Sequence, residues 1–442
     1  MMPATKLELM STVDTAMTPE KALHAGRAVG TTYSKVTVGM DLSRSSRMIR
    51  DAFVSGVLSV GSGVFNAGYV PSPAGVLAGR DSGCCAMIGE PNNYGMISGI
   101  TLRNPDGSRF NDQQIRQLEK YIGSSTPLPE YHSINTIRRC DTVASDYIKK
   151  LVDVCGEIDC PVVIDCGCGS ASTVAPQALA AAGADVTSIN SHPDRNYAPR
   201  FPGIEASEAK DAQATVKSIP GSIGIILNGD GTRVALIDEE ARYVTGSKLL
   251  ALLVKFMRPD KMVVPVDISS NVDNAFWGEE EENDRRRVVK CEPTPISLSD
   301  AMRAEKADFG ALANGSIILP GMTKCPDGIF AAAKIAQFAG TRSLSGILDE
   351  MPNYVTDSAR IHCTGSYEAL GRKINDAIDD LDYKNYLHTK GWRVDMKEGW
   401  FLLNYPDQEG IMDIKVEASD KAYAVGLLEM AKEIVNNSLR SQ

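Results

Sequence analysis

A short polar segment after the apolar run IGIIL combines residue types that could bind a cation or an anionic ligand. It reads NGDGTR and covers residues 228–233. Its oxygen donors are the amide of Asn228, the carboxylate of Asp230 and the hydroxyl of Thr232. Hard cations such as Mg²⁺ prefer oxygen ligands, but a single carboxylate supplies little charge. The segment therefore predicts no metal, or weak Mg²⁺ binding at Asp230, and the alternative is a turn in which Asp230 simply pairs with Arg233.

Two later segments combine polar side chains with turn-forming residues. Residues 311–316 read ALANGS, in which Asn314 and Ser316 can hydrogen bond to a polar ligand but Leu312 cannot. Residues 404–410 read NYPDQEG and contain no arginine, so no guanidinium can hold a phosphate through two parallel hydrogen bonds. The candidate positions in this last segment are Asn404, Pro406, Gln408 and Glu409.

A loop between two extended apolar pieces lies within residues 83–102, which read GCCAMIGEPNNYGMISGITL. This stretch resembles the phosphoserine loop of the α-D-phosphohexomutases, which reads roughly M-I-T-A-S-H-N-P and, a few residues later, N-G-I-K. The family includes phosphoglucomutase, phosphomannomutase and phosphoglucosamine mutase. The positions that match without a gap are Met87, Ile88, Asn93, Gly99 and Ile100.

The resemblance fails at the residue that would carry the phosphoryl group. The serine of the family falls on Pro91 and the neighbouring histidine falls on Asn92. Proline has neither a hydroxyl nor an N–H, so it can neither hold a phosphoryl group nor donate a hydrogen bond to one. We therefore expect no catalytic residue at this position.

The three polar segments also fall on loops of the same family. The metal loop of the family, D-G-D-x-D-R, falls on residues 228–233, its sugar loop G-E-x-S-G-H on 311–316, and its phosphate clamp R-P-S-G-T-E-P on 404–410. Each segment has lost charged or polar groups that the family pattern contains. Because four separate loops are altered, the resemblance implies a degenerate member of the family.

The order of apolar runs and helix-forming stretches predicts the fold class. The run PVVIDCGCGSAS, followed by APQALAAAGA and DVTSIN, indicates a strand–helix–strand unit and hence a parallel sheet. Together with the resemblance, this predicts three related α/β domains and a smaller C-terminal α+β domain around a central cleft. The expected divisions are residues 1–150, 151–258, 259–360 and 361–442, with a helix from about residue 136 to 154.

The amino-acid composition limits the classes of molecule that we expect this protein to bind. The 442 residues include 43% hydrophobic and 23% charged residues, with a formal net charge of −10. This charge argues against nucleic acid and anionic membranes as partners. No apolar run reaches the roughly 20 residues needed to cross a bilayer, and the ten scattered cysteines indicate buried reduced thiols. We expect a cytoplasmic protein.

Two functional hypotheses follow. The first is a protein without mutase activity that serves as a binding, regulatory or assembly subunit, with a protein partner or self-association, no cofactor, and room for a small ligand in the cleft. The alternative is a divergent active phosphosugar mutase, an intramolecular phosphotransferase that would use Mg²⁺. The sequence leaves open whether the chain is an enzyme.

Overall fold

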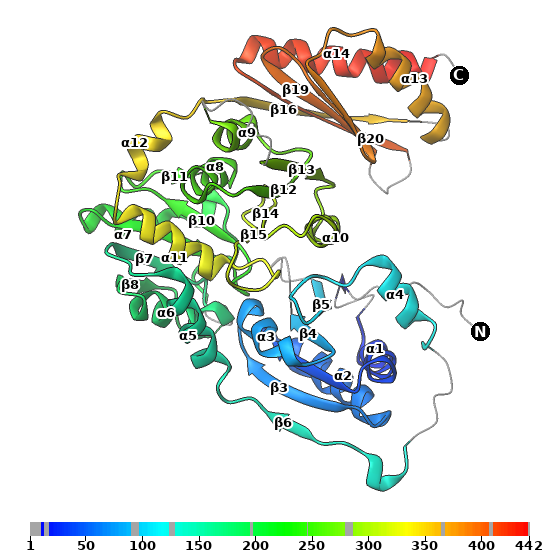
Figure 1. Cartoon of the computed structure of the whole chain (residues 1–442), viewed down its shortest axis with the longest axis vertical. Coiled ribbons are helices and arrows are strands. Elements are labelled where there is room, and N and C mark those ends of the chain that lie inside the picture. The colour runs from blue at the N-terminus through cyan, green and yellow to red at the C-terminus, as the bar shows by residue number, and fades with distance from the viewer. Residues whose placement is uncertain are drawn as a thin grey trace.

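The structure, a computed structural model, describes residues 10–12, 17–89, 97–122, 129–194, 198–244, 246–278, 286–363, 367–405 and 410–440. Four β-sheets follow one another along this part of the chain, each with helices packed beside it (Figure 1). The first three sheets contain parallel strand pairs, and the fourth is antiparallel throughout. The predicted α/β fold with a C-terminal α+β domain is confirmed.

The first sheet has the strand order β1-β5-β4-β2-β3-β6. Its strands are β1 (Met10–Thr12), β2 (Lys35–Met40), β3 (Gly63–Tyr69), β4 (Cys84–Gly89), β5 (Ile97–Arg103) and β6 (Ile137–Arg139). Its helices are α1 (Pro19–Thr32), α2 (Ser46–Ser59), α3 (Ser72–Ala78) and α4 (Asp112–Glu119). β2 is parallel to β3 and β4, whereas β4 and β5 are antiparallel. β2 and β4 therefore end at the same edge of the sheet.

Helices α1 and α2 pack unusually closely because each has a glycine at the contact. A Cβ atom at Gly26 of α1 would lie 2.0 Å from the carbonyl oxygen of Phe53, and one at Gly56 of α2 would lie 2.1 Å from that of Leu23. Real Cβ atoms do not approach other atoms this closely. The two helices therefore touch backbone to backbone over the first sheet.

The second sheet has the order β11-β10-β9-β7-β8. Its strands are β7 (Pro161–Asp165), β8 (Asp185–Ile189), β9 (Ile223–Leu227), β10 (Val234–Ile237) and β11 (Tyr243–Val244). Its helices are α5 (Val143–Cys155), α6 (Ala175–Ala181), α7 (Lys210–Ser218) and α8 (Gly246–Met257). β7 lies between β8 and β9 and is parallel to both, which confirms the predicted strand–helix–strand unit.

The third sheet has the order β13-β12-β14-β15, and the fourth the order β16-β20-β19-β18-β17. The third contains β12 (Lys261–Pro265), β13 (Arg287–Cys291), β14 (Phe309–Ala311) and β15 (Ile317–Ile318), with helices α9 (Ser270–Trp277), α10 (Pro295–Glu305), α11 (Gly328–Ala339) and α12 (Leu344–Asp349). The fourth contains β16 (Val355–His362), β17 (Asn385–His388), β18 (Gly391–Asp395), β19 (Gly399–Asn404) and β20 (Ile411–Ala418), with helices α13 (Tyr367–Asp379) and α14 (Lys421–Arg440).

Two boundaries differ from the positions expected from sequence. Strand β16 pairs with β20 over its whole length, so residues 355–360 belong to the fourth sheet although they precede the expected division at 360. Residues 137–139 form β6 beside β3, and the helix expected from residue 136 begins only at Val143. Tertiary pairing with an existing strand overrides the weak helical pattern there.

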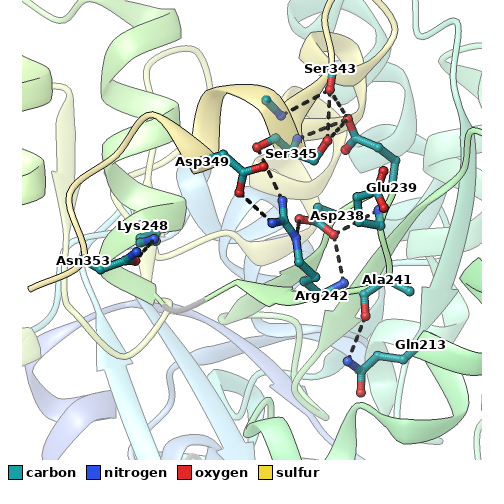
Figure 2. A network of polar contacts seen from close by, with 12 residues as sticks. Gln213, Asp238, Glu239, Ala241, Arg242, Lys248, Ser343, Ser345, Asp349 and Asn353 are labelled. Carbon is teal, nitrogen blue, oxygen red and sulfur yellow. Dashed lines mark hydrogen bonds and ion pairs between the residues drawn. The ribbon is translucent and has the colours of Figure 1, made fainter.

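A network of polar contacts ties the turn after β10 to the segment that leads into β16 (Figure 2). The guanidinium of Arg242 donates to Asp238 Oδ2 at 2.8 Å and to Asp349 Oδ1 at 2.6 Å. Glu239 Oε1 accepts a hydrogen bond from Ser343 Oγ at 2.6 Å. Because Ser343 is the N-cap of α12 and Asp349 is its last residue, these bonds hold that helix against the second sheet.

The largest hydrophobic cluster joins the second and third sheets into one core. It contains residues of β7, β9, α8, β12 and α11, together with Tyr147 and Leu151 of α5. The same cluster extends to β4 and α3 of the first domain through Cys85, Met87 and Ala74. Other residues of the first sheet form a second cluster, and the fourth sheet has a cluster of its own. Cys84, Cys85, Cys166 and Cys168 are buried, as the sequence predicts, and burial raises the pKa of Cys85 to about 12.

Candidate active site

The loop after β9 is organised around the carboxylate of Asp230. Asp230 Oδ1 accepts hydrogen bonds from Asn228 Nδ2 at 2.7 Å and from Thr232 Oγ1 at 2.6 Å. Gly231 has φ +74°, a conformation that suits glycine in a tight turn. The two residues that stand where the family pattern has aspartates thus donate to the remaining aspartate.

A residue of the first domain completes the surroundings of this carboxylate. Ser72, the first residue of α3, donates from Oγ to Asp230 Oδ2 at 2.9 Å, and its backbone N–H donates to the carbonyl of Asp230 at 2.9 Å. Ser72 is 8% exposed. The start of α3 is therefore fixed to the loop, and one hydroxyl from another domain faces the carboxylate.

The alternative in which Asp230 pairs with Arg233 is not seen. No ion pair joins these two side chains within the described part of the chain, because local donors and Ser72 already satisfy the carboxylate. The backbone N–H of Arg233 instead donates to Asn228 Oδ1 at 2.8 Å, and its backbone pairs with Ser316 in an isolated antiparallel bridge.

That bridge brings the second predicted segment, residues 311–316, beside the first. Ser316 N donates to Asn314 Oδ1 at 3.1 Å, and Leu312 N donates to the carbonyl of Ser316 at 2.9 Å. The Leu312 side chain is 5% exposed and packs in a small cluster under the third sheet. Loops 228–233 and 311–316 therefore meet, but Leu312 belongs to the core rather than to a ligand surface.

The third predicted segment lies on the fourth sheet. Asn404 ends β19 and is paired with Asp413 of β20 and Gly391 of β18. Pro406, Gln408 and Glu409 lie outside the described residues, as do Pro91 and Asn92. Asp413 also accepts a hydrogen bond from Arg360 Nε of β16 at 2.9 Å. A guanidinium is thus present beside this segment, although the sequence pattern did not point to it.

A buried ion pair supports the loop of Asp230 from the second domain. Arg200 Nη2 lies 2.7 Å from Asp165 Oδ1, and both side chains are almost completely buried. Gly167 N and Asn190 Nδ2 also donate to Asp165, each at 2.9 Å. These bonds hold the glycine-rich turn after β7 against the loop of Asp230, where a Cβ at Gly169 would lie 2.2 Å from the carbonyl oxygen of Gly229.

Two arginines near Asp230 were not singled out by the sequence. Arg109 donates from Nη2 to Thr101 Oγ1 at 3.3 Å, and Arg103, which is 6% exposed, donates from Nη1 to the carbonyl of Gly107 at 2.9 Å. Burial, aided by the charge of Arg103, lowers the pKa of Arg109 to about 10, whereas the nearby Asp230 acts to raise it. The site therefore contains more positive charge than the three segments alone indicate. Arg103 is the last residue of β5 and Arg109 follows it, in a stretch without a recognisable motif.

A second buried carboxylate lies beside the loop of Asp230. Asp327 accepts hydrogen bonds from Tyr147 OH at 2.7 and 2.9 Å and from Phe330 N, as the N-cap of α11. Burial raises its pKa from 3.8 to about 6. The next residue, Gly328, donates its N–H to the carbonyl of Gly231 at 2.9 Å, so Asp327 helps to join the second and third domains.

Comparisons with known proteins identify the family. Residues 9–128 match the family description "Phosphoglucomutase/phosphomannomutase, alpha/beta/alpha domain I", and residues 143–242 match the corresponding domain II. A "probable phosphoglucosamine mutase" of Methanocella arvoryzae is 32% identical over 97% of both chains, and one of Methanosarcina acetivorans is 30% identical over 97% of both. This chain belongs to the α-D-phosphohexomutase family of phosphoglucomutases and phosphomannomutases.

Solved structures confirm the fold. A phosphoglucomutase/phosphomannomutase family protein of Burkholderia thailandensis superposes with a TM-score of 0.85 at 17% identity and covers 99% of this chain and 98% of its own. An N-acetylphosphoglucosamine mutase of Aspergillus fumigatus, solved in complex with GlcNAc-6P and magnesium, has a TM-score of 0.54 at 12% identity, with 91% and 82% coverage.

The magnesium in that structure corrects one expectation from the sequence. We expected no cofactor, and this expectation is wrong, because a relative with this fold was solved with magnesium. The described residues contain no group of three or more His, Cys, Asp or Glu side chains placed to hold a metal. Asp230, Asn228 and Thr232 nevertheless offer only hard oxygen atoms besides the amide nitrogen, and such oxygens fit Mg²⁺.

No helix among the described residues is long and apolar enough to cross a membrane.

Proposed function

We propose that this chain is a divergent phosphosugar mutase that acts on a phosphorylated hexosamine where loops 228–233 and 311–316 meet. The observation that carries the proposal is its similarity to proteins named probable phosphoglucosamine mutase over 97% of both chains. With this coverage, each domain of those relatives has a counterpart in this chain. This proposal replaces our first hypothesis, a subunit without activity, as the leading account.

The charges around Asp230 support an anionic substrate. The carboxylate of Asp230 lies close enough to Arg109 to act on its pKa, and the buried guanidinium of Arg103 lies near Arg109. Guanidinium groups bind phosphate through paired, charge-assisted hydrogen bonds. In our proposal Arg109 orients the phosphoryl group of the substrate next to the Asp230 loop.

Mg²⁺ would be held at Asp230, with the oxygens of Asn228 and Thr232 as further ligands. The ion would supply positive charge to a phosphoryl group during transfer. Because one carboxylate is present in place of three, we expect the ion to bind more weakly than at a loop of three aspartates.

The phosphoryl group needs a carrier other than residue 91, because proline has no hydroxyl. We assign this role to Ser72, whose Oγ donates to Asp230 Oδ2 at 2.9 Å. Asp230 orients this hydroxyl, and their hydrogen bond places the hydroxyl at the same loop as the proposed ion.

The proposal is tested by following the interconversion of glucosamine 6-phosphate and glucosamine 1-phosphate by ³¹P NMR, with Mg²⁺ and a trace of hexose 1,6-bisphosphate present. We expect conversion by the natural chain and a fall of at least about tenfold in kcat/KM for Asp230→Asn, since one charged interaction is worth about 1.5–3 kcal/mol. Asp211→Asn, on the exposed first turn of α7, is the matched control and should not change the rate. Equal rates in the natural chain and Asp230→Asn would refute the proposal.

Two observations favour a second candidate function, a binding or regulatory subunit. The family serine is replaced by Pro91, and the sugar-loop position Leu312 is buried at 5% exposure. In this case the protein forms a homo-oligomer or a complex with another polypeptide that buries more than about 1,000 Å². Light scattering of the purified protein tests it: a monomer at micromolar concentration without a co-purifying partner would exclude this role.

A further inference from the structure

A hollow of about 650 Å³ lies between the second and third domains, lined by the C-terminal end of α8, helix α9 and the segment before β16. It shares no residue with loops 228–233 and 311–316. The cationic residues that line it are Lys255, Arg258 and Arg286, and Glu350 is the one carboxylate among its lining residues. Three positive charges and one negative charge thus gather in a chain whose formal net charge is −10.

The cations of the hollow differ in their partners among the residues that the structure describes. Lys255 Nζ lies 3.6 Å from Glu350 Oε2 in an exposed ion pair. Among the residues that the structure describes, no carboxylate pairs with Arg258 or Arg286. The Arg286 guanidinium lies over the ring of Phe276, 4.4 Å from its centroid. Arg286 is therefore positioned by an aromatic ring, and both guanidiniums line the hollow.

An aromatic side chain lines the same hollow. Trp277, the last residue of α9, is 37% exposed, and its ring meets Phe276 edge to face with centroids 4.9 Å apart. A partly exposed tryptophan offers a flat apolar face, on which a planar heterocycle can stack. Trp277 contributes this face beside the cations.

We propose that this hollow binds a nucleoside diphosphate, with its base stacked on Trp277 and its phosphates held by Arg258 and Arg286. A planar base and a dianionic or trianionic tail match the two kinds of group that the hollow presents, and its volume lies in the range of small-molecule sites. The arginines present several donors in a fixed plane, which suits phosphate oxygens. This site is separate from the proposed mutase site, so its binding can be measured without turnover.

The other tryptophans make the test selective. Trp392 and Trp400 are each 1% exposed, so a change in fluorescence that requires solvent contact reports on Trp277. Titration with ADP and, separately, UDP should quench the emission of the natural chain with saturation. Arg258→Gln should weaken binding of both at least about tenfold, because a charged hydrogen bond is lost, and Trp277→Phe should abolish the fluorescence response while calorimetry still detects binding.

Controls separate a nucleotide site from simple charge attraction. Lys217→Gln removes an exposed cation in the last turn of α7, far from the hollow in sequence, and should leave the affinity unchanged. Uridine and inorganic pyrophosphate should each bind at least about tenfold more weakly than UDP, since each lacks one of the two groups. The proposal is overturned if pyrophosphate binds as tightly as UDP, if Arg258→Gln and Lys217→Gln weaken binding equally, or if neither nucleotide is bound.

Discussion

Asp230 shows how a loop can keep its shape after most of its charge is replaced. Asn228 and Thr232 stand where the family pattern has carboxylates, and both now donate to Asp230 at 2.7 and 2.6 Å. A turn with three neighbouring carboxylates needs a cation to offset their repulsion, whereas this turn is satisfied by its own hydrogen bonds. The loop is therefore preformed without an ion, and Mg²⁺ binding must compete with these bonds.

The buried carboxylate of Asp327 should make stability depend on pH. Its folded pKa of about 6 lies above its ordinary value of 3.8, so the folded state binds the proton more tightly than the unfolded state does. The resulting contribution to stability is fully present below about pH 3.8 and is lost as the pH rises through about 6. Between pH 4 and 7 we expect the free energy of unfolding to fall by an amount on the order of 2 kcal/mol from this group.

Asp327→Asn removes this titration. Urea unfolding of the natural chain and the variant at several pH values should show that the difference between their stabilities changes across pH 4 to 7, in favour of the variant as the pH rises. A constant difference over this range would contradict the assignment of the raised pKa to Asp327.

The buried ion pair of Asp165 and Arg200 gives a second prediction for a single residue. Asp165→Asn leaves the buried guanidinium of Arg200 without its carboxylate, which should lower the free energy of unfolding by about 3–5 kcal/mol. Chemical denaturation measures this loss. Asp185→Asn, at an exposed position of β8, is the control, and an equally small effect for both variants would contradict the account.

At the scale of elements, the contact of α1 with α2 depends on glycine. Gly26→Ala would place a Cβ 2.0 Å from the carbonyl oxygen of Phe53, so the helices must separate, at a cost of about 1–3 kcal/mol. Gly426→Ala, on an exposed turn of α14, meets no atom within 4 Å and should be neutral or stabilising by up to about 1 kcal/mol. Thermal unfolding of both variants tests the contrast, and equal midpoints would count against backbone contact between the helices.

Strands were predictable from sequence where apolar runs are long and buried. β7 is a largely apolar, buried run and was expected as a strand of a parallel sheet. β6 was not expected, because its three residues are exposed and owe their structure to pairing with β3. The contrast indicates that local pattern predicts an element when burial decides it, and fails when a neighbouring strand decides it.

The candidate site was predictable only in part for a similar reason. The positions of loops 228–233 and 311–316 followed from resemblance, and the structure brings these loops together. The Ser72–Asp230 contact joins residues 158 positions apart, and Arg109 lies in a stretch without a motif, so nothing local revealed either. The environment of Asp230 depends on tertiary contacts that no single segment contains.

At the scale of the whole molecule, the site lies where separate domains meet. Ser72 comes from the first domain, Asp230 from the second and Ser316 from the third, and backbone bonds join all three segments. A phosphosugar held there would contact several domains at once, so its binding should stabilise their arrangement. We expect glucosamine 6-phosphate at saturating concentration to raise the midpoint of thermal unfolding, as any ligand selective for the folded state does. An unchanged midpoint at concentrations up to the millimolar range would contradict binding.

The most direct test of the account is whether the chain itself accepts a phosphoryl group. The protein is incubated with ³²P-labelled glucose 1,6-bisphosphate and Mg²⁺, and the labelled peptide is mapped by mass spectrometry. We predict up to one phosphoryl group per chain, located on Ser72 and absent from Ser72→Ala, even though position 91 is proline. An unlabelled chain, under conditions in which a sugar phosphate binds, would show that this member of the family does not act as a mutase.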